Sequence, residues 1–223
     1  MPWMFARTPE LVDQSEALKG GDAPVLPNPQ PHAVLGTPIT GPWKDNQREL
    51  LVGVGCYWGP EKLFWNLDGV ESTAVGFAGG VTKNPTYREV CTGRTNHVEI
   101  VRVVYDPEKI NLEEVAAKAL EDHDPTQGFR QGNDVGTQYR SAFYAVGPEA
   151  QEDKERIQAL VDSYAQKLAQ HGYGEVTTEI KRLDETPAGE FYLAEDEHQQ
   201  YLYKNPLGYC PAHSTGVPCG PDA

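Results

Sequence analysis

The sequence predicts an α+β fold: a mixed sheet with packed helices, forming a two-layer, sandwich-like core. Strand and helix patterns are intermixed, but they do not follow the strict alternation of a doubly wound fold. With 39% hydrophobic residues, a chain of 223 residues can bury one sizeable core. Eight of the eighteen prolines precede residue 48, where no helical or strand period is sustained. We therefore expect an irregular N-terminal arm (1–47), one α+β domain (48–204) and a C-terminal coil (205–223).

The elements of the domain follow from hydrophobic periodicity and from turn and capping residues. Apolar or alternating runs predict five strands, in chain order at 50–54, 70–77, 98–105, 141–146 and 176–183. A first helix, at about 60–67, is ended by Asp68-Gly69. A second begins after Asn111, which forms a capping-box pattern with Glu114. A third extends from Pro148 to Gly172.

Two segments fit neither a helix nor a strand pattern. Residues 123–140 form a long, polar, glycine-containing stretch, and structureless loops of that length inside a compact domain are usually functional or disordered. Residues 205–223 have no apolar period and are expected to be coil. That coil carries two of the four cysteines, Cys210 and Cys219.

Composition argues against several classes of partner and of location. The net charge is −14, and the nineteen Lys and Arg residues form no basic stripe, so we expect no nucleic-acid partner. No apolar run is long enough to span a bilayer, and the N-terminus has no stretch of signal-peptide type. We therefore expect a cytoplasmic protein. Four cysteines are too few for a disulfide scaffold in a chain of this length, so they are thiols, metal ligands or redox-active residues.

The most informative segment is the pentapeptide GCYWG at 55–59, between the first predicted strand and the first predicted helix. It places the thiol of Cys56 at a helix N-terminus, where unpaired N–H groups and the helix dipole favour the reactive thiolate. Tyr57 and Trp58 provide an apolar wall beside it. The alternative is that Cys56 is a small buried hydrophobe. The flanking glycines favour a functional role, because they let another group approach the backbone closely.

The spacing of the cysteines limits the chemistry. Cys56, Cys91, Cys210 and Cys219 include no C-x₂-C or C-x₄-C pair, and no histidine stands at ligand spacing from them, so we expect no metal. A mobile tail can bring a thiol to a distant cysteine at small cost, because loop-closure entropy grows only logarithmically with length. That arrangement suits a peroxidatic or sulfoxide-reducing enzyme. In such an enzyme the core cysteine becomes a sulfenic acid, and a tail cysteine condenses with it to a disulfide.

Seven motifs, in the same order, carry a resemblance to a known family. They are GCYWG (55–59), GFAGG (76–80), NPTYREV (84–90), HVE (97–99), HDPTQ (123–127), QGNDVGTQYRS (131–141) and EHQQY (197–201). Over about 50–219 the chain resembles peptide methionine sulfoxide reductases of the A type. Two departures stand out: Tyr57 where Phe is more common, and Asn96 where Gly is usual, a change at the rim near Glu99.

The resemblance implies a role for each part of the site. Cys56 would attack the sulfoxide sulfur, and Tyr57 with Trp58 would receive the substrate's S-methyl group. Glu99 shares a strand face with Val101, Val103 and Tyr105. Burial there would raise the pKa of its carboxyl and allow it to donate a proton to the sulfoxide oxygen. The alternative for Glu99 is a carboxylate paired with a basic neighbour.

The remaining roles are also implied by the resemblance. Tyr87 and Tyr139 would hydrogen-bond the sulfoxide oxygen, and Asp134 would orient the site, although an ordinary half-buried tyrosine and a turn aspartate are the respective alternatives. In relatives with two tail cysteines, the first resolves the sulfenic acid and the second displaces the core cysteine, which assigns these steps to Cys210 and Cys219. Cys91 is expected to be a buried, inert thiol.

We therefore expect an enzyme that reduces methionine S-sulfoxide, free and in oxidised proteins, with no cofactor. It would act as a monomer and be recycled by a dithiol protein such as thioredoxin. Two other functions remain open on the residues alone. One is a cysteine hydrolase that uses His97 or His198 as its base. The other is a non-catalytic, thiol-containing binding module.

Overall fold

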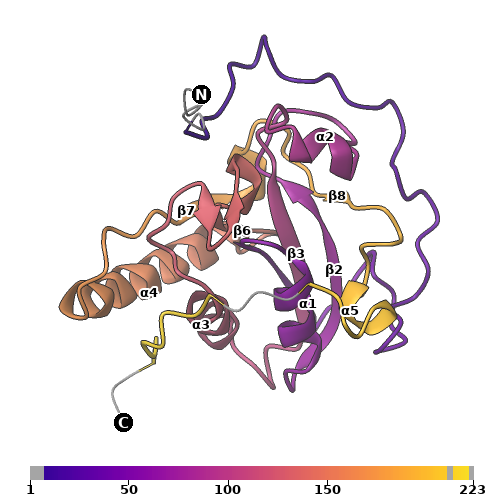
Figure 1. Cartoon of the computed structure of the whole chain (residues 1–223). Helices are drawn as coiled ribbons and strands as arrows, with labels where there is room; N and C mark the ends of the chain where they lie inside the picture. Colours follow the sequence, from indigo (N-terminus) through magenta and orange to yellow (C-terminus); the bar gives the residue numbers. More distant parts are fainter. Residues whose placement is uncertain (1–7, 210–212, 221–223) are drawn as a thin grey trace, which may run out of the picture.

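The computed structural model describes residues 8–209 and 213–220. Its centre is a six-stranded sheet in the order β7-β6-β1-β3-β2-β8 (Figure 1). The strands are β1 (Arg48–Val54), β2 (Val70–Ala78), β3 (Val98–Tyr105), β6 (Ser141–Ala145), β7 (Glu179–Arg182) and β8 (Tyr192–Leu193). All neighbours pair antiparallel except β6 and β7, which are parallel because a helix connects them. The predicted α+β class with a mixed sheet is confirmed.

Five α-helices accompany the sheet in the described part of the chain. They are α1 (Trp58–Trp65), α2 (Tyr87–Cys91), α3 (Leu112–Asp122), α4 (Ala150–Gln170) and α5 (Tyr201–Lys204). The capping box at the start of α3 is present: the Asn111 side chain accepts from the Glu114 N–H, and the Glu114 carboxylate accepts from the Asn111 N–H. The helices α1 and α4 each begin two residues from the predicted position.

The two faces of the sheet are covered differently. Helices α1, α3 and α4 pack on one face, where Leu50, Val75 and Phe143 are fully buried (Figure 1). The opposite face is covered by segments without α-helix, which include Leu183 of the 3₁₀ turn η2 (Leu183–Glu185) and Phe191. Alternation along β3 therefore directs Glu99, Val101 and Val103 to the helix side and Arg102 to the other, as predicted.

The N-terminal arm wraps around the domain. Residues 8–47 contain no helix or strand, and one isolated bridge joins Gly20 to Lys83. The Leu18 N–H donates to the Arg94 carbonyl at 2.9 Å, and His32 lies buried with its Nε2 2.8 Å from Thr73 Oγ1. In Figure 1 the arm follows the outside of the molecule from one end of the sheet to the other.

Several elements differ from the sequence prediction. The predicted strand at 176–183 is confined to β7, because only those residues pair with β6. Helices α2 and α5 and strand β8 were not predicted at all. The long loop 123–140 is not structureless: it holds a hairpin, β4 (Arg130–Gln131) with β5 (Asp134–Val135), followed by the 3₁₀ turn η1 (Thr137–Tyr139). No helix among the described residues is long and apolar enough to cross a membrane.

Candidate active site

Cys56 lies in the turn between β1 and α1, one residue before the helix N-cap. Tyr57 occupies the N-cap position, and no side chain caps the helix there. The first N–H groups of α1 are therefore available to an anion beside Cys56. Gly55 adopts a φ of +93°, and a Cβ at this position would lie 2.7 Å from Gln131. The β4–β5 hairpin therefore approaches the backbone closely beside Cys56, as the flanking glycine predicts. Cys56 itself is half-buried.

Glu99 is the buried acid of the site. Its side chain is 1% exposed, and its Oε2 accepts the Tyr57 N–H at 3.2 Å, while Oε1 has no hydrogen-bond partner among the described residues. Burial, reinforced by the nearby charge of Asp134, raises the pKa of Glu99 to about 8, although the Tyr57 N–H opposes the shift. No ion pair to Glu99 exists within 8–209 and 213–220, which argues against the paired-carboxylate alternative. At neutral pH its carboxyl group is mainly protonated and can donate.

Tyr87 and Tyr139 approach the same acid from two other elements. Tyr87 opens α2, whose capping box pairs Thr86 with Glu89, and Tyr139 ends η1. Both side chains are half-buried. Burial first, and then the proximity of Glu99, raises the pKa of each phenol above its ordinary value. Both therefore remain hydrogen-bond donors throughout the neutral range.

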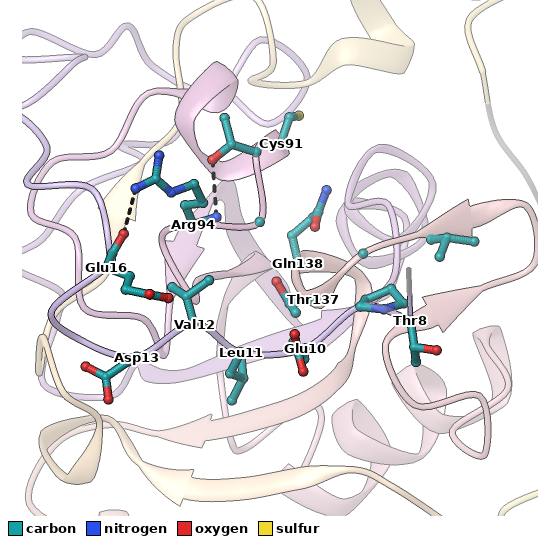
Figure 2. A pocket seen from close by; sticks show the side chains of 15 residues that line it. Thr8, Glu10, Leu11, Val12, Asp13, Glu16, Cys91, Arg94, Thr137 and Gln138 are labelled. Carbon is teal, nitrogen blue, oxygen red and sulfur yellow. Dashed lines mark hydrogen bonds between the residues drawn. The ribbon is translucent and has the colours of Figure 1, made fainter. Parts of the chain in front are cut away.

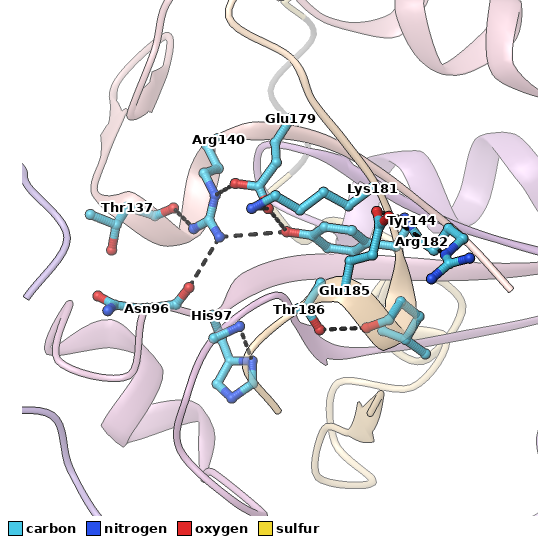
Figure 3. A network of polar contacts seen from close by, with 12 residues as sticks. Asn96, His97, Thr137, Arg140, Tyr144, Glu179, Lys181, Arg182, Glu185 and Thr186 are labelled. Atoms are coloured by element: carbon cyan, nitrogen blue, oxygen red, sulfur yellow. Dashed lines mark hydrogen bonds and ion pairs between the residues drawn. The ribbon is translucent and has the colours of Figure 1, made fainter. Parts of the chain in front are cut away.

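Arg140 holds the turn that carries Tyr139. Arg140 is 5% exposed, and its guanidinium donates to the carbonyls of Thr137 at 2.9 Å and Asn96 at 3.1 Å (Figure 3). Glu179 on β7 pairs with it at 3.3 Å and also accepts from the Tyr144 hydroxyl at 2.9 Å. Buried charge-assisted bonds of this kind fix a loop more firmly than surface ones.

Tyr57 and Trp58 form an aromatic wall together with His198 and Tyr201, to which the sequence analysis gave no role in binding the substrate. The Trp58 ring stacks on Tyr201 at 4.0 Å and lies nearly parallel to His198 at 5.9 Å. His198 in turn lies 4.3 Å from the Tyr87 ring. The EHQQY motif was the sequence signal for Tyr201, and His198 was named there also as a candidate base. The Tyr57 hydroxyl and Trp58 Nε1 are buried without partners in the described structure, so the wall includes polar atoms able to bind a ligand.

A buried carboxyl holds the EHQQY segment against α1. Glu61, one turn along from Tyr57, is fully buried and accepts from the Gln200 N–H and side-chain amide, each at 2.8 Å. Thr73 Oγ1 lies 3.2 Å away and links this pair to His32 of the arm. Burial raises the pKa of Glu61 to about 7, while its hydrogen bonds to Gln200 and Thr73 oppose the shift.

Asp134 lies in β5, directly after the hairpin turn, and contributes to the electrostatics around Glu99. Its Oδ2 accepts from the Tyr209 hydroxyl at 3.2 Å. Tyr209 is the last described residue before the gap at 210–212, so the chain reaches the site immediately before Cys210. Cys210 itself lies outside the described residues.

Cys219 is buried at 4% exposure on the helical side of the sheet. Its N–H donates to Glu121 of α3 at 2.8 Å, and the Tyr164 hydroxyl of α4 donates to the Val217 carbonyl at 3.0 Å. Burial raises the pKa of the Cys219 thiol to about 11. The tail from 213 to 220 is therefore docked, and Cys219 is held protonated in this arrangement.

Cys91 is exposed, so the expectation of a buried thiol is wrong. It ends α2, where only the preceding Val90 points into the core. The Tyr87 hydroxyl bonds to its sulfur, while partial burial raises the pKa of the thiol. Cys91 thus lies at the edge of the site, beside one of its phenols.

His97 is not available as a catalytic base. Its Nδ1 accepts the Gly80 N–H at 3.1 Å, and its Nε2 lies 2.7 Å from the Thr82 carbonyl. Both ring nitrogens are therefore engaged by backbone, and burial lowers the pKa of His97 to about 4. This occupancy argues against His97 as the base of a hydrolase and leaves His198 as the other candidate.

Comparison with known proteins agrees with this geometry. The family model for peptide methionine sulfoxide reductase matches residues 48–217. The reductase of Corynebacterium glutamicum strain R is 62% identical over the full length of both chains. The solved methionine sulfoxide reductase A of Corynebacterium diphtheriae is 63% identical, covers 96% of this chain and all of its own, and superposes with a TM-score of 0.88. Mxr1 of Saccharomyces cerevisiae, in reduced form, is 32% identical over 75% of this chain and 91% of its own, with a TM-score of 0.66.

These matches exclude the hydrolase and binding-module alternatives, because they cover the whole domain that carries Cys56 and Glu99. The chain therefore belongs to the peptide methionine sulfoxide reductase family and is an oxidoreductase that reduces methionine sulfoxide.

Proposed function

We propose that the enzyme reduces methionine S-sulfoxide, free and in proteins, by a sulfenic acid at Cys56. The observation that supports this most directly is the buried, protonated Glu99, with one oxygen unpartnered in the described structure, beside two phenols and the turn of Cys56. The Cys56 thiolate attacks the sulfoxide sulfur, while Glu99 gives its proton to the oxygen. Tyr87 and Tyr139 stabilise that oxygen as its negative charge grows.

The first half-reaction then ends with transfer of the oxygen. Two electrons pass to the substrate sulfur, methionine leaves, and Cys56 carries the hydroxyl as a sulfenic acid. Tyr57 and Trp58 would hold the S-methyl group. The rings of His198 and Tyr201, which pack against Tyr57 and Trp58 respectively, extend that apolar surface. Asp134 would keep the local field negative and so keep Glu99 protonated.

Recycling follows by thiol chemistry on the tail. Cys210 attacks the sulfenic sulfur, forming a Cys56–Cys210 disulfide and releasing water; Cys219 then displaces Cys56, leaving a Cys210–Cys219 disulfide. The position of Tyr209 against Asp134 supports the first step, since it brings the tail to the site. The burial of Cys219 implies that the tail must leave α3 and α4 before the second.

A dithiol protein such as thioredoxin would reduce the final disulfide, which implies a reducing compartment such as the cytoplasm. We propose a monomer, which light scattering would test. The chemistry itself is tested without any reductant. Adding methionine S-sulfoxide should consume two thiols with the first methionine formed. Because the second exchange frees Cys56, a second methionine should follow as Cys56 is oxidised again, whereas formation of methionine without thiol loss would contradict the mechanism.

A further inference from the structure

A cleft lies beside the active site, between the arm and the loops that carry the catalytic groups. Its volume is about 680 Å³. Arm residues 8–13 and 16 form one wall, while residues 91–94 and 135–138 form the other (Figure 2). A cleft of this size can hold a ligand of several residues.

Two buried polar side chains in this cleft have unused hydrogen-bonding atoms. Thr137 is 3% exposed and Gln138 5% exposed, yet Thr137 Oγ1 and Gln138 Oε1 have no partner among the described residues. Leaving such an atom unpaired is unfavourable, so a ligand group that pairs with it is favoured. The side-chain carboxamide of Gln138 has an NH₂ donor and a carbonyl acceptor. These can pair with the carbonyl and the N–H of a peptide group. In Figure 2 the Gln138 amide points toward Cys91, which lies on the same wall of the cleft.

The cleft adjoins the active site at two places on the wall formed by residues 91–94 and 135–138. Cys91 lines it and contacts the Tyr87 hydroxyl. On the same wall Gln138 directly precedes Tyr139 in η1. Tyr87 and Tyr139 are the two phenols proposed to bind the sulfoxide oxygen, so a ligand in the cleft can remain covalently attached to a methionine sulfoxide at Cys56.

The arm is fastened as the outer wall by Asn96. This residue has a φ of +59°, in the left-handed region that favours glycine. Its Oδ1 accepts the Val12 N–H at 3.0 Å, and its Nδ2 donates to the Val12 carbonyl at 2.8 Å, as a paired strand residue would. Arg94 adds a bond to the Glu16 carbonyl at 2.8 Å.

We propose that this cleft binds the polypeptide that flanks the oxidised methionine, an inference that rests on the proposed reaction at Cys56. The flanking chain lies extended between the arm and η1, and its peptide groups bond to Thr137 and Gln138. Asp13 and Glu16 on the arm wall are exposed carboxylates, so basic flanking residues are preferred. Free methionine sulfoxide does not extend into the cleft.

The test compares a heptapeptide with central methionine S-sulfoxide against the free amino acid, using dithiothreitol as reductant. Asn96→Gly retains the backbone conformation and removes the arm anchor, and Gln138→Met removes the amide. For each, the ratio of kcat/KM for peptide to that for free substrate should fall by about 3–10-fold, the value of one or two hydrogen bonds. Gln166→Met, an exposed residue of α4 away from this cleft, is the matched control and should leave the ratio unchanged.

A second readout needs no turnover. In a Cys56→Ser background, anisotropy of a labelled, lysine-flanked sulfoxide heptapeptide should show tighter binding than its glutamate-flanked equivalent. Asn96→Gly should reduce that difference. Three results would contradict the proposed subsite. They are an equal loss of kcat/KM for peptide and free substrate, a peptide-to-free ratio unchanged in both variants, and equal affinity for the lysine-flanked and glutamate-flanked peptides. Failure of the parent enzyme to reduce either substrate would instead contradict the proposed chemistry at Cys56.

Discussion

Replacing Glu99 by Gln should lower the activity of the enzyme and raise its stability near neutral pH. Both effects follow from the loss of the buried proton that Glu99 carries. The amide preserves shape and can donate a hydrogen bond, but it cannot give up a proton to the sulfoxide oxygen. The single-turnover rate should therefore fall by roughly the 10²–10⁴-fold expected for a lost acid. In the parent enzyme this rate should also decline as the pH rises through about 8, where Glu99 ionises.

The effect on stability has the opposite sign. The pKa of Glu99 rises from 4.5 to about 8 on folding, so the native state holds this proton more tightly than the unfolded chain does. The corresponding stabilisation is complete below pH 4.5 and is lost as the pH rises towards 8. At about 1.4 kcal/mol per pH unit, the loss reaches about 4 kcal/mol by pH 8. Gln carries no such proton, so relative to the parent the variant should gain that amount over this range.

The assay is denaturant unfolding of parent and variant at each pH from 4.5 to 8, beside single-turnover rates. Glu61→Gln is the control for activity, because Glu61 is equally buried but hydrogen-bonds Gln200 and Thr73 rather than facing the site. It should not reduce the rate by 10²-fold. If the unfolding free energies of the parent and of Glu99→Gln changed by the same amount between pH 4.5 and 8, Glu99 would be ionised in the native protein. That result would refute the proposed acid role.

Three further predictions address the thiols and the aromatic wall. Cys56→Ser should abolish turnover, since a hydroxyl at a helix N-terminus stays protonated; more than trace dithiol-dependent activity would show that another group is the nucleophile. Cys219→Ser should still form one methionine and a Cys56–Cys210 disulfide by peptide mapping, but recycle poorly with thioredoxin and much better with a small dithiol. Recycling at the parent rate would make Cys219 a bystander. Tyr57→Phe removes a buried, unpartnered hydroxyl and should stabilise the fold by about 1 kcal/mol with activity kept within a few-fold. A large drop in its single-turnover rate would instead make that hydroxyl a donor to the substrate.

The sequence determined the features that depend on residues close together in the chain. The turn at Cys56, the capping box at Asn111 and the side of β3 on which Glu99 lies all follow from local periodicity and spacing. These signals are strong because one strand or helix turn decides them. The Thr86–Glu89 capping box was an equally local signal and would have predicted α2.

Only the tertiary structure decided what lies across the chain from these residues. Asn96 meets the arm 84 residues away, and Glu61 meets Gln200 at a separation of 139. Cys91 proved exposed because α2 turns only its preceding residue into the core, and Cys219 proved buried because α3 and α4 offer it a docking surface. Such contacts depend on how elements pack rather than on the propensities of the residues themselves, so no local pattern contains them.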